Sequence, residues 1–162
     1  MVTYLRLAPA ATRTEALSDA PSIRVVLADD HELMRHSLRQ LLDGDAGVQV
    51  VAEASDQAQA IKLSHDRRPH VLVLDLRLQG GSSLETLAVL RGQAPDTRVV
   101  ITTMEISPAF AQRAFEVGAA GFVAKDLADS ELIDAVRTVA GGGRYAGPRV
   151  AHMLRPLLAA SL

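Results

Sequence analysis

Ionisable and hydroxyl side chains follow the apolar runs of this sequence. Asp29 and Asp30 come directly after the run from Ile23 to Ala28, and Asp75 ends the run that begins at Val71. Carboxylates brought together repel one another unless a cation lies among them. The pattern therefore predicts a cation site, and Mg²⁺ suits it because Mg²⁺ favours one or two carboxylates together with water and phosphate oxygens.

A carboxylate beside such an ion can attack phosphorus and form an aspartyl phosphate. Asp75 is the predicted acceptor, because its strand is apolar and presents the acid at its tip. Lys125 follows a later run and would stabilise the transferring group by its charge. Thr103, at the end of another run, offers a hydroxyl that would hydrogen-bond one phosphoryl oxygen.

These residues can form one site only in a fold that brings the carboxyl ends of several strands together. Short runs rich in Val, Ile and Leu alternate with stretches of helical period, and we predict five strands from them: 23–28, 48–54, 71–74, 98–103 and 121–124. Right-handed crossovers between such units give a parallel sheet with helices on both faces. The predicted fold is therefore α/β, a doubly wound five-stranded parallel sheet whose binding crevice lies at the carboxyl ends of the strands.

The composition fits one such domain and excludes other classes. The 162 residues are 48% hydrophobic but only 3% aromatic, as expected for a core of aliphatic side chains. A net charge of −2 argues against nucleic-acid binding through the overall field. The absence of cysteine fits a cytoplasmic protein, and residues 1–22 match neither a signal peptide nor a membrane span.

The chain divides into three parts on this reading. We predict a flexible N-terminal extension over 1–22, one domain over 23–143, and a C-terminal amphipathic tail or linker over 144–162. Pro156 should kink or split the helix of that tail, which either presents an apolar patch or folds back on the domain. If the patch is exposed, a symmetric homodimer is the expected assembly.

Four segments carry a resemblance to a known family. RVVLADDHELMRHSL, VLVLDLRLQGGSSLETL, VVITTM and GFVAKD, in this order, resemble the receiver domain of two-component response regulators, in particular the NarL/FixJ-like branch with a C-terminal LuxR-type helix-turn-helix. The resemblance implies a flavodoxin-like strand order 2-1-3-4-5. It also implies a sensor histidine kinase as partner, an output in transcription regulation, and no enzymatic activity beyond the chain's own phosphorylation and dephosphorylation.

The resemblance assigns roles to single residues. Asp75 matches the phosphoacceptor, Lys125 the lysine of the family pattern, Thr103 the switch hydroxyl, and Phe122 the aromatic side chain whose rotamer follows the switch. No segment matches a helix-turn-helix, so we expect no DNA-binding domain in this chain, and we expect no membrane partner.

For the metal, the resemblance implies a Mg²⁺ site held by Asp29, Asp30, Asp75 and the backbone carbonyl of Arg77, with Asp30 a direct ligand. His31 and His36 are five residues apart and do not share a helical face, so solvent or capping roles are favoured over a metal site for them.

The sequence also departs from the family pattern. Gln79 stands where a proline is usual, and Ser82 and Ser83 replace an Asp-Gly pair, so the loop after the third strand should differ in shape. Two other classes stay open at this point. One is a pseudo-receiver that binds partners without phosphorylation, and the other is an α/β phosphatase, although the second aspartate that such a hydrolase needs is replaced by Arg77.

Overall fold

The structure, a computed structural model, describes residues 22–160, with side chains up to residue 156. The predicted N-terminal extension lies outside these residues except for Ser22. In chain order the elements are β1 (Ile23–Ala28), α1 (Glu32–Asp43), β2 (Val48–Ala54), α2 (Gln57–Arg67), β3 (Val71–Asp75), α3 (Ser83–Gln93), β4 (Arg98–Thr103), α4 (Pro108–Val117), β5 (Gly121–Ala124), a 3₁₀ turn η1 (Lys125–Leu127), α5 (Ala128–Ala140), β6 (Tyr145–Ala146) and α6 (Pro148–Ala160).

All strands of the sheet are parallel, in the order β2-β1-β3-β4-β5-β6. This confirms the doubly wound α/β fold and the 2-1-3-4-5 order of its first five strands. The predicted number of strands was wrong, because β6 adds a sixth at the edge. Tyr145 pairs with Gly121 and Ala146 with Phe122, and a strand of two residues is too short to produce a recognisable alternation in sequence.

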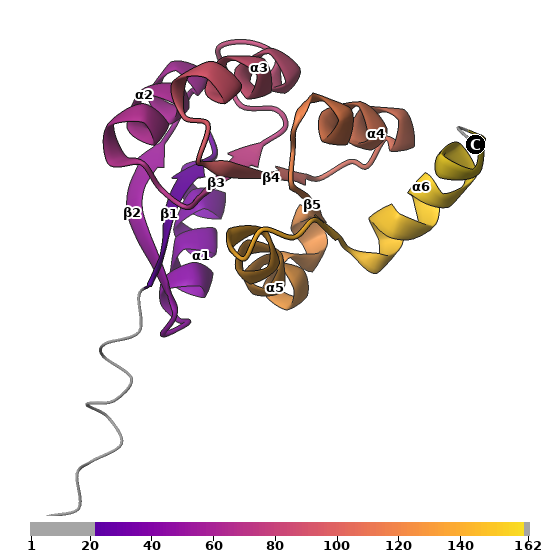
Figure 1. Cartoon of the computed structure of the whole chain (residues 1–162). Helices are drawn as coiled ribbons and strands as arrows, with labels where there is room; N and C mark the ends of the chain where they lie inside the picture. The colour runs from indigo at the N-terminus through magenta and orange to yellow at the C-terminus, as the bar shows by residue number, and fades with distance from the viewer. Residues whose placement is uncertain (1–21, 161–162) are drawn as a thin grey trace, which may run out of the picture.

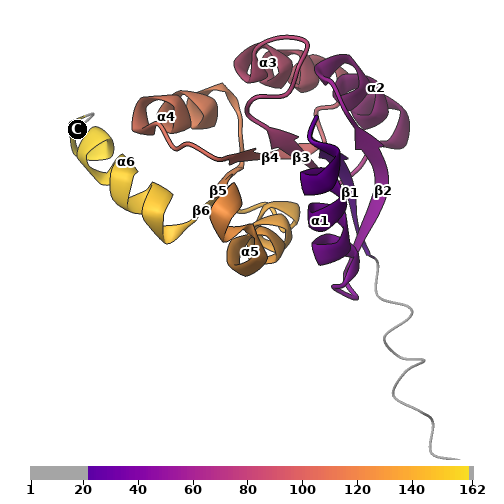
Figure 2. The same ribbon diagram turned by 180° about the vertical axis from the view of Figure 1, so that it is seen from behind.

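Helices cover both faces of the sheet (Figures 1 and 2). Helices α1 and α5 lie on one face, and α2, α3 and α4 lie on the other. Side chains of β1 alternate accordingly: Val25 and Leu27 pack into the core under α1 and α5, whereas Val26 and Ala28 pack into the opposite core. Burial on both faces explains why the strands read as continuous apolar runs.

The C-terminal helix α6 packs against α4 (Figure 1). Val150 and Leu154 are buried in the core on the α4 side of the sheet, with 1% and 7% of their surface exposed. Pro156 was expected to kink or split this helix, and the helix is not split there, since α6 continues through Pro156. Pro156 removes one hydrogen bond to the carbonyl of His152, but both residues are exposed, so water can satisfy that carbonyl. Among the described helices, none combines the length and the apolar character that crossing a bilayer requires.

Candidate functional site

Two buried carboxylates meet at the carboxyl edge of the sheet. Strands β1 and β3 are hydrogen-bonded neighbours in which Ala28 pairs with Leu74, so the residues that follow, Asp29 and Asp75, lie side by side. Their side chains are only 1% and 4% exposed. Asp30 is adjacent and is 15% exposed. The sheet register thus forms an acidic pocket from residues 46 positions apart in the sequence.

Lys125 supplies the positive charge of this pocket. It follows β5, and its long side chain reaches across to place Nζ 2.7 Å from Asp29 Oδ2 and 2.9 Å from Asp75 Oδ2. Burial by itself would lower the pKa of the Lys125 ammonium, but its hydrogen bond to Asp29 and the charges of both carboxylates outweigh burial and raise that pKa above its ordinary value. Lys125 is therefore a fixed cation between two acids.

Two buried carboxylate oxygens of the pocket lack a donor in hydrogen-bonding geometry. Both oxygens of Asp29 are engaged, one by Lys125 and the other by the His31 backbone N–H at 2.8 Å. Asp75 Oδ1 accepts from the Arg77 backbone N–H at 3.1 Å. Asp75 Oδ2 is buried and has only its ion pair with Lys125 Nζ at 2.9 Å, and Asp30 Oδ1 is buried without a donor in hydrogen-bonding geometry. Such a donor set fits Mg²⁺, which coordinates carboxylate oxygen and keeps several waters.

The predicted switch residues, Thr103 and Phe122, make their contacts outside the pocket. Thr103 Oγ1 donates to the backbone carbonyl of Glu105 at 2.8 Å, so its hydroxyl belongs to the turn that begins the β4–α4 loop. Phe122 is fully buried on the α4 side of the sheet, where its ring lies 6.4 Å from the ring of Phe115 at an interplanar angle of 43°. Phe122 therefore connects the sheet to α4, and Thr103 connects it to the loop before α4.

The loops beside Asp75 are tied to each other and to the domain. An ion pair of 2.6 Å joins Arg77, in the loop after β3, to Glu105, in the loop after β4. Ser83, one of the residues that depart from the family pattern, is buried and donates to the Leu76 carbonyl at 2.8 Å. This bond fixes the start of α3 to the end of β3.

Three residues near the site were not predicted from the sequence. Arg35 of α1 donates to the Asp29 backbone carbonyl at 2.7 Å and to Glu53 Oε1 at 3.2 Å. Gln57 of α2 holds the loop after β3. His31 is the N-cap residue of α1, but its side chain makes no capping hydrogen bond and lies with the acids instead. The sequence feature that could have placed His31 at the site was its position directly after Asp30, rather than its spacing from His36.

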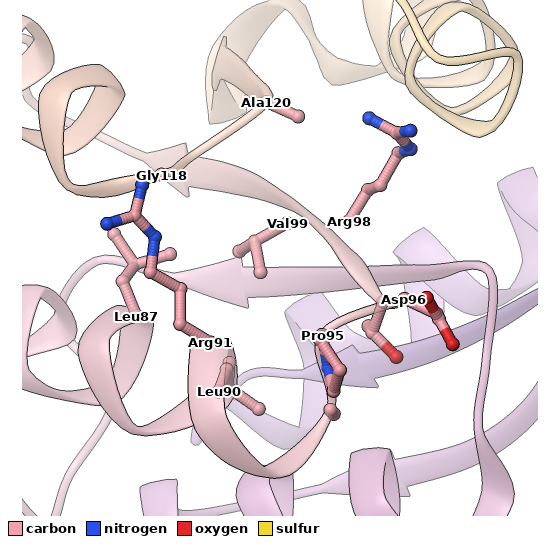
Figure 3. Close-up of a pocket in the computed structure, with 11 residues that line it drawn as sticks. Leu87, Leu90, Arg91, Pro95, Asp96, Arg98, Val99, Gly118 and Ala120 are labelled. Carbon is pink, nitrogen blue, oxygen red and sulfur yellow. The ribbon is translucent and has the colours of Figure 1, made fainter.

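A separate pocket of about 290 Å³ lies at the opposite edge of the sheet (Figure 3). It is formed around the end of α3 and the start of β4, by residues that include Leu90, Arg91 and Val99. The side chains of Arg91 and Arg98 point apart there, and Arg91 packs on Gly118. Because Asp75 is at the carboxyl end of β3, this pocket is no part of the acidic site.

Comparison with known proteins agrees with this arrangement. The family described as response regulator receiver domain matches residues 25–137. The nitrate/nitrite response regulator protein NarP of Escherichia coli (strain K12) is 37% identical over 139 residues, which cover 86% of this chain and 65% of NarP. The chain spans about 62 to 65% of the length of the first curated relatives that it matches.

Solved structures show the same fold. A two-component response regulator of the LuxR family from Aurantimonas sp. SI85-9A1 superimposes with a TM-score of 0.81 at 34% identity, covering 85% of this chain and 99% of that one. The isolated REC domain of RcsB from Salmonella enterica serovar Typhimurium, determined in the presence of phosphomimetic BeF₃⁻, gives a TM-score of 0.76 at 25% identity, covering 82% and 99%.

Proposed function

This chain belongs to the response regulator receiver domain family, and from that premise we propose that Asp75 accepts a phosphoryl group from a sensor histidine kinase in a Mg²⁺-dependent reaction. The observation that supports this most is the position of Asp75. Its carboxylate is buried beside Asp29 and Asp30, with Oδ2 2.9 Å from the Lys125 ammonium. An acid held between a cation and a predicted metal site is placed to attack phosphorus.

Each residue of the acidic pocket would have its own role in phosphoryl transfer. An oxygen of Asp75 forms a bond to phosphorus while the bond from phosphorus to the donor breaks. Lys125 balances the charge on the phosphoryl oxygens. Asp29, Asp30, Asp75 and the Arg77 carbonyl would hold Mg²⁺, which when bound supplies further positive charge at those oxygens. We propose no enzymatic activity beyond the chain's own phosphorylation and dephosphorylation.

Phosphorylation would then change the α4 side of the domain. We propose that Thr103 leaves the Glu105 carbonyl and donates to a phosphoryl oxygen, which alters the loop before α4. Phe122 and α4 respond in the same step, as expected for a two-state switch. The output is a change in self-association or in a partner contact, in the cytoplasm and in the control of transcription.

Intact mass measured after incubation with acetyl phosphate and Mg²⁺ tests the phosphorylation step. We expect one base-labile phosphoryl group on the wild type and on the control variant Asp96→Asn. Asp96 is an exposed acid outside the acidic pocket of Asp29, Asp30 and Asp75. Asp75→Asn and a sample without divalent metal should gain none. If the folded wild type gains none from acetyl phosphate or from a kinase, the pseudo-receiver replaces this proposal, and multiple-turnover release of phosphate would support a hydrolase instead.

A further inference from the structure

An imidazole stands at the mouth of the acidic pocket. His31 Nδ1 lies 3.0 Å from Asp30 Oδ1 and 3.6 Å from Asp29 Oδ1. Asp29, Asp30, His31 and Asp75 each offer one ligand atom, and these atoms all lie within 4.8 Å of one another. The His31 side chain is 74% exposed, so its ring can bind an ion without losing core contacts.

The short contact between His31 and Asp30 is not a hydrogen bond. Asp30 Oδ1 is buried and has no donor in hydrogen-bonding geometry, although Nδ1 is only 3.0 Å away. Another histidine of the chain provides a comparison, because His65 Nδ1 and Asp66 Oδ1 lie 3.1 Å apart in hydrogen-bonding geometry. Both pairs are adjacent in the sequence, in opposite order, and have similar distances, but only His65 and Asp66 have hydrogen-bonding geometry. His31 and Asp30 therefore present two electron-pair donors side by side.

This arrangement has the dimensions of a coordination sphere. In an octahedral complex with bonds of about 2.1 Å, neighbouring ligand atoms are about 3.0 Å apart and opposite ones about 4.2 Å apart. The Nδ1 to Oδ1 distance of 3.0 Å matches that of neighbouring ligand atoms, while the outer limit of 4.8 Å for the whole group is wider than 4.2 Å, so the side chains would draw slightly closer around an ion. In such a complex the nitrogen lone pair is directed at the ion rather than at the neighbouring oxygen, which agrees with a short contact that is not a hydrogen bond.

We propose that His31 is a metal ligand that makes the phosphoacceptor pocket a site for borderline divalent ions such as Co²⁺, Ni²⁺ and Zn²⁺. Carboxylate and water suit Mg²⁺, whereas imidazole favours these later ions, which also bind nitrogen and oxygen sites more tightly in general. The inference rests on the proposed function for the presence of a metal between Asp30 and Asp75. It adds that a second class of ion competes with Mg²⁺ for that position.

Calorimetric titration of the untagged protein with Co²⁺ and with Mg²⁺ tests this proposal. His31→Gln should weaken Co²⁺ binding about tenfold or more while changing Mg²⁺ binding less than about twofold. It should also shift the visible absorption of bound Co²⁺, because a nitrogen ligand is lost. His65→Gln is the matched control, since it removes an exposed histidine beside an aspartate away from the pocket, and it should leave both affinities unchanged.

The outcomes separate this proposal from the function on which it rests. If the wild type binds Mg²⁺ and is phosphorylated, but His31→Gln weakens Co²⁺ and Mg²⁺ binding equally or not at all, only the role of His31 is refuted. If the wild type binds neither ion, or if Asp30→Asn leaves both affinities unchanged, the metal site of the proposed function fails as well. Equal Co²⁺ loss in His31→Gln and His65→Gln would mean surface binding by histidine and would also refute the proposal.

Discussion

At the scale of single residues, the positive charge of Lys125 stabilises the two buried carboxylates of the acidic pocket. Asp29 and Asp75 are almost completely buried and face the same ammonium at 2.7 and 2.9 Å. A buried charge without a partner is costly. The Lys125 pKa is raised in the folded protein, so its stabilising contribution is complete below the pKa of the unfolded chain. It is lost only when the pH rises through the folded value, in strongly alkaline solution.

Lys125→Met should therefore destabilise the protein near neutral pH. Removing one partner of a buried ionic group leaves two acids facing each other, and we expect a loss of about 3 kcal/mol in the free energy of unfolding. Mg²⁺ should restore part of this loss, since the ion binds the folded state and neutralises the same carboxylates. Urea unfolding with and without Mg²⁺ measures both effects.

The control for Lys125→Met is Lys62→Met, which breaks an exposed pair with Asp66. Its stability should be close to that of the wild type, with or without the metal. A Lys125→Met variant as stable as the wild type, or one that Mg²⁺ stabilises no more than it stabilises the wild type, would contradict the role of Lys125 as the cation of the pocket.

The sequence was sufficient to predict that Asp29, Asp75 and Lys125 gather, because each ends a strand and the carboxyl ends of parallel strands share one edge of the sheet. The position of His31 beside the acids was not predicted, because His31 was compared only with His36. The bond between Thr103 and the Glu105 carbonyl depends on the conformation of a loop, which no residue pattern specifies.

At the scale of elements, α2 holds the loop that follows β3. Gln57 Nε2 donates to the carbonyls of Leu78 at 3.0 Å and Gly81 at 2.6 Å. The Gln57 backbone N–H donates to the Gln79 carbonyl at 2.9 Å. Gly80 permits the turn between them, because its φ of 102° is disfavoured for other residues. A loop without the usual proline is thus fixed by a side chain from another element.

Gln57→Ala should release this loop. The change removes two hydrogen bonds from a buried side chain and leaves their carbonyls to find other partners, which costs about 1 to 3 kcal/mol in the free energy of unfolding. Amide exchange in residues 76–82 should become faster, while the strands remain protected. Urea unfolding and hydrogen exchange measured by mass spectrometry provide the two readouts.

Gln40→Ala is the control for Gln57→Ala, because Gln40 is an exposed residue within α1. It should change neither the unfolding free energy by more than a few tenths of a kcal/mol nor the exchange of the loop. If Gln57→Ala behaves in the same way, the loop is held by its own turns rather than by α2.

Local signals were enough to predict where helices begin, but not how the end of the chain packs. Ser82 and Asp56 are residue types that favour N-cap positions, and their side chains accept from the backbone N–H groups of Leu84 and Gln59. The pairing of β6 with β5 and the packing of α6 on α4 depend on contacts between distant segments, which a helical period in the tail cannot specify.

At the scale of the whole molecule, a continuous set of contacts runs from the pocket to α6. Thr103 bonds to Glu105, the loop containing Glu105 leads into α4 at Pro108, and α4 packs against α6 through the core that contains Val150 and Leu154. Helix α6 follows β6 and is the last element described (Figure 2). A change at Asp75 that moves α4 should therefore reach the C-terminal segment.

Hydrogen exchange with and without BeF₃⁻ and Mg²⁺ tests this connection. We expect exchange to change at least about twofold in α4 and in residues 148–156, because Thr103 exchanges its bond to Glu105 for one to the phosphoryl mimic. Helix α2, on the far side of α3, should not respond.

Asp75→Asn should abolish the effect together with binding. Thr103→Val should still bind the mimic but leave α6 unchanged, since it lacks the hydroxyl. A response of α4 without one of α6 would show that the two helices move independently, and the C-terminal helix would then have no part in the output.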